Sequence, residues 1–348
     1  MTKKINFAII GCGRISCKHA NAIKEIPDAN LVVVCDVIES KAKKLAAECG
    51  CDYTTDYNQV LARPDVDVIN ICTPSGNHAE ITIAGAKAKK HVVTEKPMAM
   101  NLQQADEMIA ECKKNGVKLF VVKQNRYNDP VVKLKRALDQ GRFGKLFMGN
   151  VTVRWSRPQS YYDEDDWRGT KARDGGVLMN QASHHIDLLQ WMLGEPESVT
   201  AQKATMTHNI EAEDTGIAII KFKNGAFGVV EATTCIYHKN LEGSIAIFGD
   251  SGSVKVGGFA VNVMEHWEFK DFCNDDALIA QTATNPPNVY GFGHVEFMKN
   301  VVGAIKNDKL PFVSGEEGRK SLELIEAIYL AAETGREIKL PLKGATNG

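Results

Sequence analysis

Two side chains in this sequence could take a proton from a substrate hydroxyl: the imidazole of His184 and the amine of Lys96. An unperturbed imidazole titrates near neutral pH, so His184 can serve as a general base. The segment 178–193 predicts a helix, on which Asn180 and Asp187 share a face with His184 opposite an apolar face. Either side chain could orient the imidazole, and such a helix suits the wall of a cleft.

Two other interpretations of this helix remain open. A lone histidine is more often a structural residue than a catalytic one. A metal site could combine His184, His185 and Asp187, but on a helix His185 points about 100° away from His184. We therefore predict no metal at this site.

Lys96 lies in the tripeptide Glu95-Lys96-Pro97, which directly follows a predicted buried strand. At the end of a strand, a lysine can bind a substrate hydroxyl and stabilise its alkoxide character during hydride loss. The alternative is a plain surface ion pair between Glu95 and Lys96. The position at the end of the strand and the stiff proline behind it favour the catalytic role.

A dinucleotide-binding turn is predicted at the start of the chain, where Gly11, Gly13 and Ser16 follow the first strand. Gly11 permits a tight turn and Gly13 lets the backbone approach a pyrophosphate, with Arg14 and Ile15 leading into the helix. Asp36 ends the second strand, where a carboxylate can bind the ribose 2′-hydroxyl and would repel a 2′-phosphate. The sequence therefore predicts NAD rather than NADP, although Asp36 could instead only cap the sheet edge.

Another loop predicted to border the cofactor follows the next long strand. In an open parallel sheet, ligands bind beyond the carboxyl ends of the strands. An ordinary turn has the same composition, and both interpretations stand. The candidate residues here are Thr73, Pro74, Asn77 and His78.

Arginines and aromatic residues alternate in the segment 154–173, where guanidinium groups could grip phosphate or carboxylate oxygens. Arg157 is the first choice for a substrate carboxylate, and a solvated loop is the alternative. The other candidates are Arg154, Arg168, Lys171 and Arg173.

Positioning these residues requires two different architectures. The first 123 residues alternate short Val- and Ile-rich strands with helical segments, which predicts a doubly wound parallel sheet. After residue 124, alternating strands and an Asn224-Gly225 hairpin predict a mostly antiparallel open sheet with helices on one face. The polar stretch 271–288 predicts a surface loop, and two helices follow it. We expect an NAD-binding domain over 1–124 and a substrate-binding and oligomerisation domain over 125–348.

Composition excludes several classes of protein. The 348 residues carry 42 Lys+Arg and 43 Asp+Glu, a net charge of -1, which argues against a nucleic-acid or anionic-membrane partner. No apolar run approaches the ~20 residues that span a bilayer. The start of the chain predicts a strand, not a signal peptide. The nine cysteines show no Cys-x-x-Cys pair, which is typical of a cytoplasmic protein.

The turn at Gly11–Ser16, the tripeptide 95–97 and His184 with Asp187, in this order, resemble the glucose-fructose oxidoreductase/inositol dehydrogenase (Gfo/Idh/MocA) family over essentially the whole chain. The motifs 123–128, 155–162 and 179–184 resemble one branch, the UDP-N-acetyl-2-amino-2-deoxyglucuronate dehydrogenases of O-antigen biosynthesis. The resemblance implies a Rossmann domain with NAD, and a second α/β domain whose sheet packs in a dimer or tetramer. It also implies that NADH stays bound in some members and is reoxidised by 2-oxoglutarate.

The resemblance also assigns roles. Lys96 would contact the reacting hydroxyl and His184 would be the general base. Asn180 lies beside His184 in the sequence where many relatives have Asp. Because of this difference, either His184 or Lys96 could take the hydroxyl proton. Glu95, Lys96, Gln124, Trp167 and Arg168 would contact the cofactor, and the substrate would meet Arg157, Tyr161, Asn180, Gln181 and His184.

The expected reaction is therefore NAD-dependent oxidation of the C3 hydroxyl of UDP-N-acetylglucosaminuronic acid to a 3-keto sugar. Another sugar or a cyclitol such as inositol is the first alternative substrate. A non-catalytic NAD-binding regulator is the second alternative, although such a sensor needs neither Lys96 nor His184.

Overall fold

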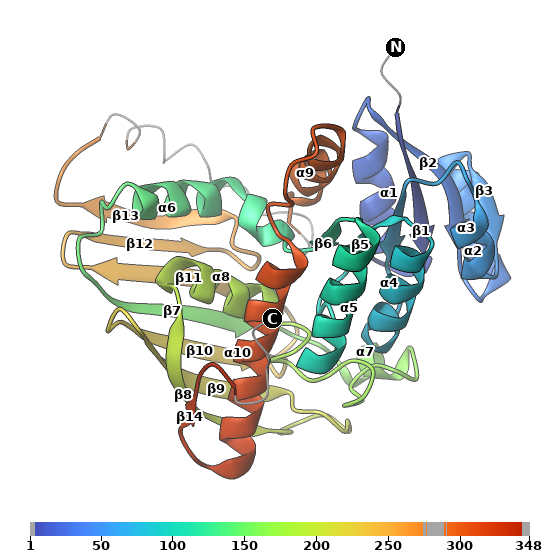
Figure 1. Cartoon of the computed structure of the whole chain (residues 1–348). Helices are drawn as coiled ribbons and strands as arrows, with labels where there is room; N and C mark the ends of the chain where they lie inside the picture. Colours follow the sequence, from blue (N-terminus) through green and yellow to red (C-terminus); the bar gives the residue numbers. More distant parts are fainter. Residues whose placement is uncertain (1–3, 274–275, 277–288, 290, 343–348) are drawn as a thin grey trace. The chain divides into compact units, whose positions relative to one another are not determined.

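The computed structural model describes residues 4–273, 276, 289 and 291–342, and within them it forms two compact units (Figure 1). The first unit combines residues 1–123 with 294–319, and the second combines 124–293 with 320–348. Residues 294–319, which the sequence suggests as part of the second domain, thus pack within the first unit. Most of the stretch 271–288, expected to be a surface loop, lies outside the described residues.

A six-stranded parallel sheet forms the centre of the first unit, in the order β3-β2-β1-β4-β5-β6. The strand order reverses between β1 and β4, which in doubly wound sheets marks the ligand-binding edge. The predicted parallel fold is therefore confirmed. The strands are β1 (Ile5–Ile10), β2 (Ala29–Cys35), β3 (Asp52–Thr54), β4 (Val68–Ile71), β5 (His91–Thr94) and β6 (Leu119–Val121).

Helices connect these strands, and glycines end two of them. Gly50 and Gly116 adopt left-handed conformations with φ of 68° and 69°, which an L-side chain would strain. The side chain of Asn101 caps α5 by accepting the N–H of Gln104 at 2.9 Å. The helices of this unit are α1 (Ser16–Lys24), α2 (Glu39–Cys49), α3 (Tyr57–Ala62), η1 (Ser75–Asn77), α4 (His78–Lys87), α5 (Leu102–Asn115) and α9 (His294–Lys306).

The second unit is built on an eight-stranded mixed sheet in the order β13-β12-β11-β7-β10-β9-β8-β14. All neighbours are antiparallel except β7 and β10, which run parallel. The predicted hairpin at Asn224-Gly225 joins β9 to β10. The strands are β7 (Leu146–Arg154), β8 (Pro196–Ala204), β9 (Thr215–Phe222), β10 (Phe227–Thr233), β11 (Glu242–Gly249), β12 (Gly252–Gly257), β13 (Val263–Phe269) and β14 (Ile338–Lys339).

Helices cover one face of this sheet, and α8 lies across β7, β11 and β10 (Figure 1). Apolar side chains are exposed along β7, β9 and β10, at Phe147, Ile217, Ile219 and Phe227. The helices are η2 (Gln124–Tyr127), α6 (Asp129–Asp139), α7 (Gln159–Asp163), α8 (Ser183–Leu193) and α10 (Gly315–Thr334), the last of which begins in the first unit.

The expected helix over 178–193 is wrong in its first turn. The helix α8 begins at Ser183, because residues before it form turns in which Asn180 N–H bonds to Gly176 O at 2.9 Å. The side chains of His184 and Asp187 on this helix are largely buried. No helix among the described residues is long and apolar enough to cross a membrane.

Candidate active site

The glycine turn of the first unit has the geometry that a dinucleotide requires. Gly11 has φ of 96°, and a Cβ there would lie 2.6 Å from the main chain of Cys72, so no side chain fits. A Cβ on exposed Gly13 would meet nothing within 4 Å, which leaves room for a phosphate beside its backbone. Arg14 and Ile15 follow directly and lead into α1. The turn therefore fits the pyrophosphate of NAD.

Asp36 is held rigidly at the end of β2. One carboxylate oxygen accepts the N–H of Cys12 in the glycine turn at 2.8 Å, and the other accepts the N–H of Ile38 at 2.8 Å. A carboxylate oxygen has a second lone pair, so each can still accept a hydrogen bond from a ribose hydroxyl. The side chain is half-buried, as a residue that both supports the turn and meets a ligand would be.

His78 joins two loops at the same edge of the sheet. Its ring nitrogens lie 2.8 Å from Pro97 O and 3.0 Å from Thr73 O. Burial lowers the pKa of His78, against the two carbonyl oxygens that raise it, and the ring lies between the loop after β4 and the loop after β5. Pro74 and Asn77 lie at the two ends of η1.

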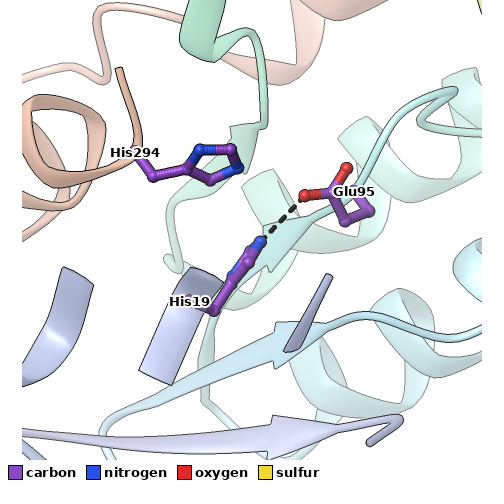
Figure 2. A group of neighbouring side chains, drawn as sticks. All are labelled: His19, Glu95 and His294. Atoms are coloured by element: carbon purple, nitrogen blue, oxygen red, sulfur yellow. Dashed lines mark hydrogen bonds and ion pairs between the residues drawn. The ribbon is translucent and has the colours of Figure 1, made fainter. Parts of the chain in front are cut away.

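Glu95 lies in a buried cluster with His19 of α1 and His294 of α9 (Figure 2). The Nε2 atom of His19 is 2.8 Å from Glu95 Oε1, and Asn70 Nδ2 donates to His19 Nδ1 at 3.0 Å. Because Nδ1 accepts, the ring proton is on Nε2 and His19 donates to Glu95. A metal ion held between these side chains would have to replace that proton.

The carboxylate of Glu95 is ionised although it is buried. Burial raises the pKa of Glu95, but the hydrogen bond from His19 and the charge of Lys96 outweigh it and bring the pKa to about 2. The second carboxylate oxygen accepts the N–H of Lys96 at 3.1 Å. The cluster thus fixes the main chain of Lys96 and places a negative charge beside its ammonium group.

His184 is positioned in the second unit by a residue that the resemblance assigned to the cofactor. Gln124 Nε2 lies 3.1 Å from His184 Nε2, and both side chains are buried. Asn180 donates through Nδ2 to Asp174, and Gln181 is buried next to it. The half-exposed Asn180 and the nearly buried His184 lie in consecutive turns of the chain.

Asp187 has a different partner from the one the sequence suggested. Its two carboxylate oxygens accept bonds of 2.8 and 2.9 Å from Arg126 Nε and Nη2, and the pair is almost completely buried. The guanidinium of Arg126 also lies 4.9 Å from the ring centre of Trp191. The pair ties η2 to α8 and so places Gln124 against His184.

The arginine-rich segment divides into paired and unpaired cations. Arg154 binds Glu231 and Glu242, Arg168 binds Asp165, and Arg173 binds Asp166. Within the described ranges, no carboxylate forms an ion pair with Arg157 or with exposed Lys171. The structure therefore leaves Arg157 as the half-buried guanidinium of the segment whose charge no protein carboxylate neutralises.

Aromatic rings and neutral oxygens hold Arg157 in place. Its guanidinium carbon lies 5.2 Å from the ring centre of Trp155 and 5.4 Å from that of Tyr161. Its Nη1 atom donates to Ser156 O at 2.7 Å and to Asn240 Oδ1 at 3.1 Å. Arg168 lies over Tyr161 and Trp167, at 4.4 and 4.7 Å from their ring centres.

Three residues of this framework were not found by sequence reasoning: His19, Arg126 and His208. His19 follows the glycine turn by three residues, one helical turn from Ser16, so its position in the motif was a usable signal. Arg126 and His208 pair with residues that lie 61 and 6 positions away, and nothing in the local pattern indicates those contacts.

Comparison with known proteins identifies the family. Residues 5–123 match the model of an oxidoreductase family with an NAD-binding Rossmann fold, and residues 135–340 match that of its C-terminal alpha/beta domain. The chain is 30% identical to the myo-inositol 2-dehydrogenase of Thermotoga maritima, over 97% of this chain and 98% of that protein.

Two solved structures are more similar. The WlbA dehydrogenase of Bordetella pertussis, in complex with NADH and UDP-GlcNAcA, is 44% identical with a TM-score of 0.95, covering 99% of each chain. The WlbA dehydrogenase of Chromobacterium violaceum, with the same ligands, is 45% identical with a TM-score of 0.93, covering 99% of this chain and 98% of that one. With its glycine turn and Asp36 shaped for the dinucleotide, the chain belongs to the Gfo/Idh/MocA family of oxidoreductases and is an NAD-dependent enzyme.

Proposed function

We propose that this protein oxidises the C3 hydroxyl of UDP-N-acetylglucosaminuronic acid to the 3-keto sugar, with reduction of NAD to NADH and release of one proton. The observation that carries the proposal is Arg157, a guanidinium held by rings and neutral oxygens with no protein carboxylate paired to it in the described parts of the chain. Such a group binds an anionic ligand without first breaking an ion pair. The similarity to proteins solved with UDP-GlcNAcA supports this substrate.

Each residue of the proposed site has its own part in the reaction. When bound, NAD supplies the acceptor for the hydride that leaves C3. His184 takes the hydroxyl proton as general base, oriented by Gln124 and with Asn180 in the preceding turn. Lys96, whose main-chain N–H is held by Glu95, stabilises the developing alkoxide. Beside Arg157, a surface of stacked side chains would contact the nucleotide of the substrate and the cofactor. This surface consists of Tyr161, Trp167 and Arg168.

The test is a substrate comparison. Purified protein is supplied with NAD and either UDP-N-acetylglucosaminuronic acid, the neutral UDP-N-acetylglucosamine or myo-inositol, and NADH absorbance is followed. We expect turnover to be fastest with the uronic acid. Faster turnover with inositol would show a cyclitol dehydrogenase instead, and NAD binding without turnover of any sugar would favour the regulator.

We also propose that the protein is a homo-oligomer that works in the cytoplasm on nucleotide sugars for bacterial surface polysaccharide. The exposed apolar side chains of β7, β9 and β10 support packing against a second copy, because an interface would bury them. The nine cysteines, all within described residues, are free thiols, as in a reducing compartment. Light scattering of an Ile219→Lys variant tests the interface: a smaller particle than wild type supports it, and an unchanged mass contradicts it.

A further inference from the structure

His208 lies in the connection between β8 and β9 and touches two functional parts of the second unit. Its Nδ1 atom is 2.9 Å from Asp214 Oδ2, and its Nε2 atom is 2.7 Å from the carbonyl oxygen of Arg157. The side chains of His208 and Asp214 are 8% and 0% exposed. Asp214 is therefore not a surface carboxylate, and its partner is fixed by packing.

Two hydrogen-bond acceptors lie nearest to the ring nitrogens of His208, and the Thr207 hydroxyl lies 3.3 Å from Nδ1. A carbonyl oxygen carries no proton. Burial opposes ionisation of Asp214, but the N–H groups of Thr207, Met206 and His208 donate to it and bring its pKa to about 2, so it is a carboxylate. A proton on Nε2 is therefore needed for the bond to the carbonyl oxygen of Arg157.

Other polar groups lie close to the ring. The Tyr162 ring lies 5.0 Å away, and its hydroxyl is 2.9 Å from Thr234 Oγ1. The Cys235 thiol completes a group of three possible metal ligands with His208 and Asp214. A metal would need a lone pair on His208, and both ring nitrogens already face acceptors within 2.9 Å.

The hydrogen bond from His208 matters because it holds the main chain of Arg157, the residue proposed to bind the substrate. Arg157 N–H donates to Thr234 O at 3.0 Å, and its carbonyl accepts from His208. The main chain at Arg157 is thereby held by hydrogen bonds on both sides. This fixes the point from which the Arg157 side chain extends. Without His208, the Arg157 side chain would have to be ordered when the ligand binds, which costs affinity.

We propose that His208 is a positioning residue: by joining Asp214 to the main chain of Arg157, it sets the guanidinium for the carboxylate of the uronic acid substrate. The inference rests on the proposed function, since it concerns the same ligand. It assigns His208 no contact with substrate and no part in proton transfer. Its effect is on the strength of uronate binding, not on the chemical step.

A double-mutant cycle tests the proposal. We expect His208→Gln to raise KM for UDP-N-acetylglucosaminuronic acid about tenfold (~1.4 kcal/mol) and to leave kcat within about twofold. In an Arg157→Ala background, the same substitution should add almost nothing, because the guanidinium it positions is gone. His266→Gln, at an exposed histidine on β13, is the matched control and should leave both constants unchanged.

If His208→Gln folds poorly, the pair His208→Gln/Asp214→Asn, which buries no charge, replaces it.

Results that contradict the positioning role can be told apart from results that contradict the proposed function. An unchanged KM, additive effects with Arg157→Ala, or an equal loss of kcat would overturn the positioning role while the wild-type enzyme still turns over the uronic acid. Stoichiometric zinc in the purified protein, lost in His208→Gln, would show a metal site instead. No wild-type turnover of the uronic acid would instead reject the proposed function itself.

Discussion

The side chain of Asp36 has two roles. It supports the glycine turn and is expected to bind the ribose of the cofactor. We expect Asp36→Ala to weaken NAD binding about tenfold, as loss of a charged hydrogen bond costs ~1.5 kcal/mol or more. The affinity for NADP should fall less, since the variant no longer repels a 2′-phosphate. Fluorescence titration with each dinucleotide measures both constants.

The control for this substitution is Glu39→Ala, three residues further along in the exposed first turn of α2. It should leave both dissociation constants unchanged. If Asp36→Ala weakens NAD and NADP by the same factor, Asp36 only supports the turn and does not select the cofactor.

At the scale of single residues, the sequence predicts types of chemistry better than partners. Gly11 and Asp36 could be assigned because the turn and the strand end before them follow local rules. The partner of Asp187 could not, because Arg126 reaches it from another element. Asn180 was placed on a helix that in fact begins at Ser183, because the residues before Ser183 form turns.

The helix α8 depends on one buried ion pair. Removing a single partner leaves an uncompensated buried charge, so Arg126→Met should lower the free energy of unfolding by ~3–5 kcal/mol. The double variant Arg126→Met/Asp187→Leu buries no charge and should cost much less. Urea unfolding of both variants measures the difference.

An exposed pair is the control. Lys221→Met removes an ion pair on β9 with about half of each side chain exposed, and should change stability by less than ~1 kcal/mol. If the double variant is as unstable as Arg126→Met, then the packing of the arginine rather than its charge holds η2 against α8.

At the scale of elements, local signals located most helices and strands. Gly50, Gly116 and the Asn224-Gly225 turn mark ends that the structure confirms. The short, exposed β3 has no apolar run and was not predicted. The parallel pairing of β7 with β10 was also beyond the sequence, because it joins strands more than seventy residues apart and no local pattern encodes their direction.

The stability of the whole molecule should fall in mild acid. Burial lowers the pKa of His185 from 6.5 to about 4, so the folded protein binds fewer protons than the unfolded chain between these values. Stability from this residue is therefore present above about pH 6.5 and is lost as the pH falls toward 4. Urea unfolding at several pH values should show this slope, and His185→Leu should flatten it.

A steeper loss is expected below that range. The depressed pKa values of Glu95 and Asp214 make both carboxylates stabilising above about pH 4, and this stability disappears as the pH falls through 2. Equal slopes for wild type and His185→Leu between pH 6.5 and 4 would show that other groups control unfolding in mild acid.

The order of segments in the two units has a consequence for how the protein is made. The first unit contains residues 294–319, whose Val313 carbonyl accepts the N–H of Val121 at the edge of the parallel sheet and whose His294 joins Glu95. A nascent chain leaving the ribosome therefore has its nucleotide-binding unit in an unfinished form until residues 294–319 have been translated. Synthesis that stops early would release a fragment whose sheet edge is open to chaperones and proteases.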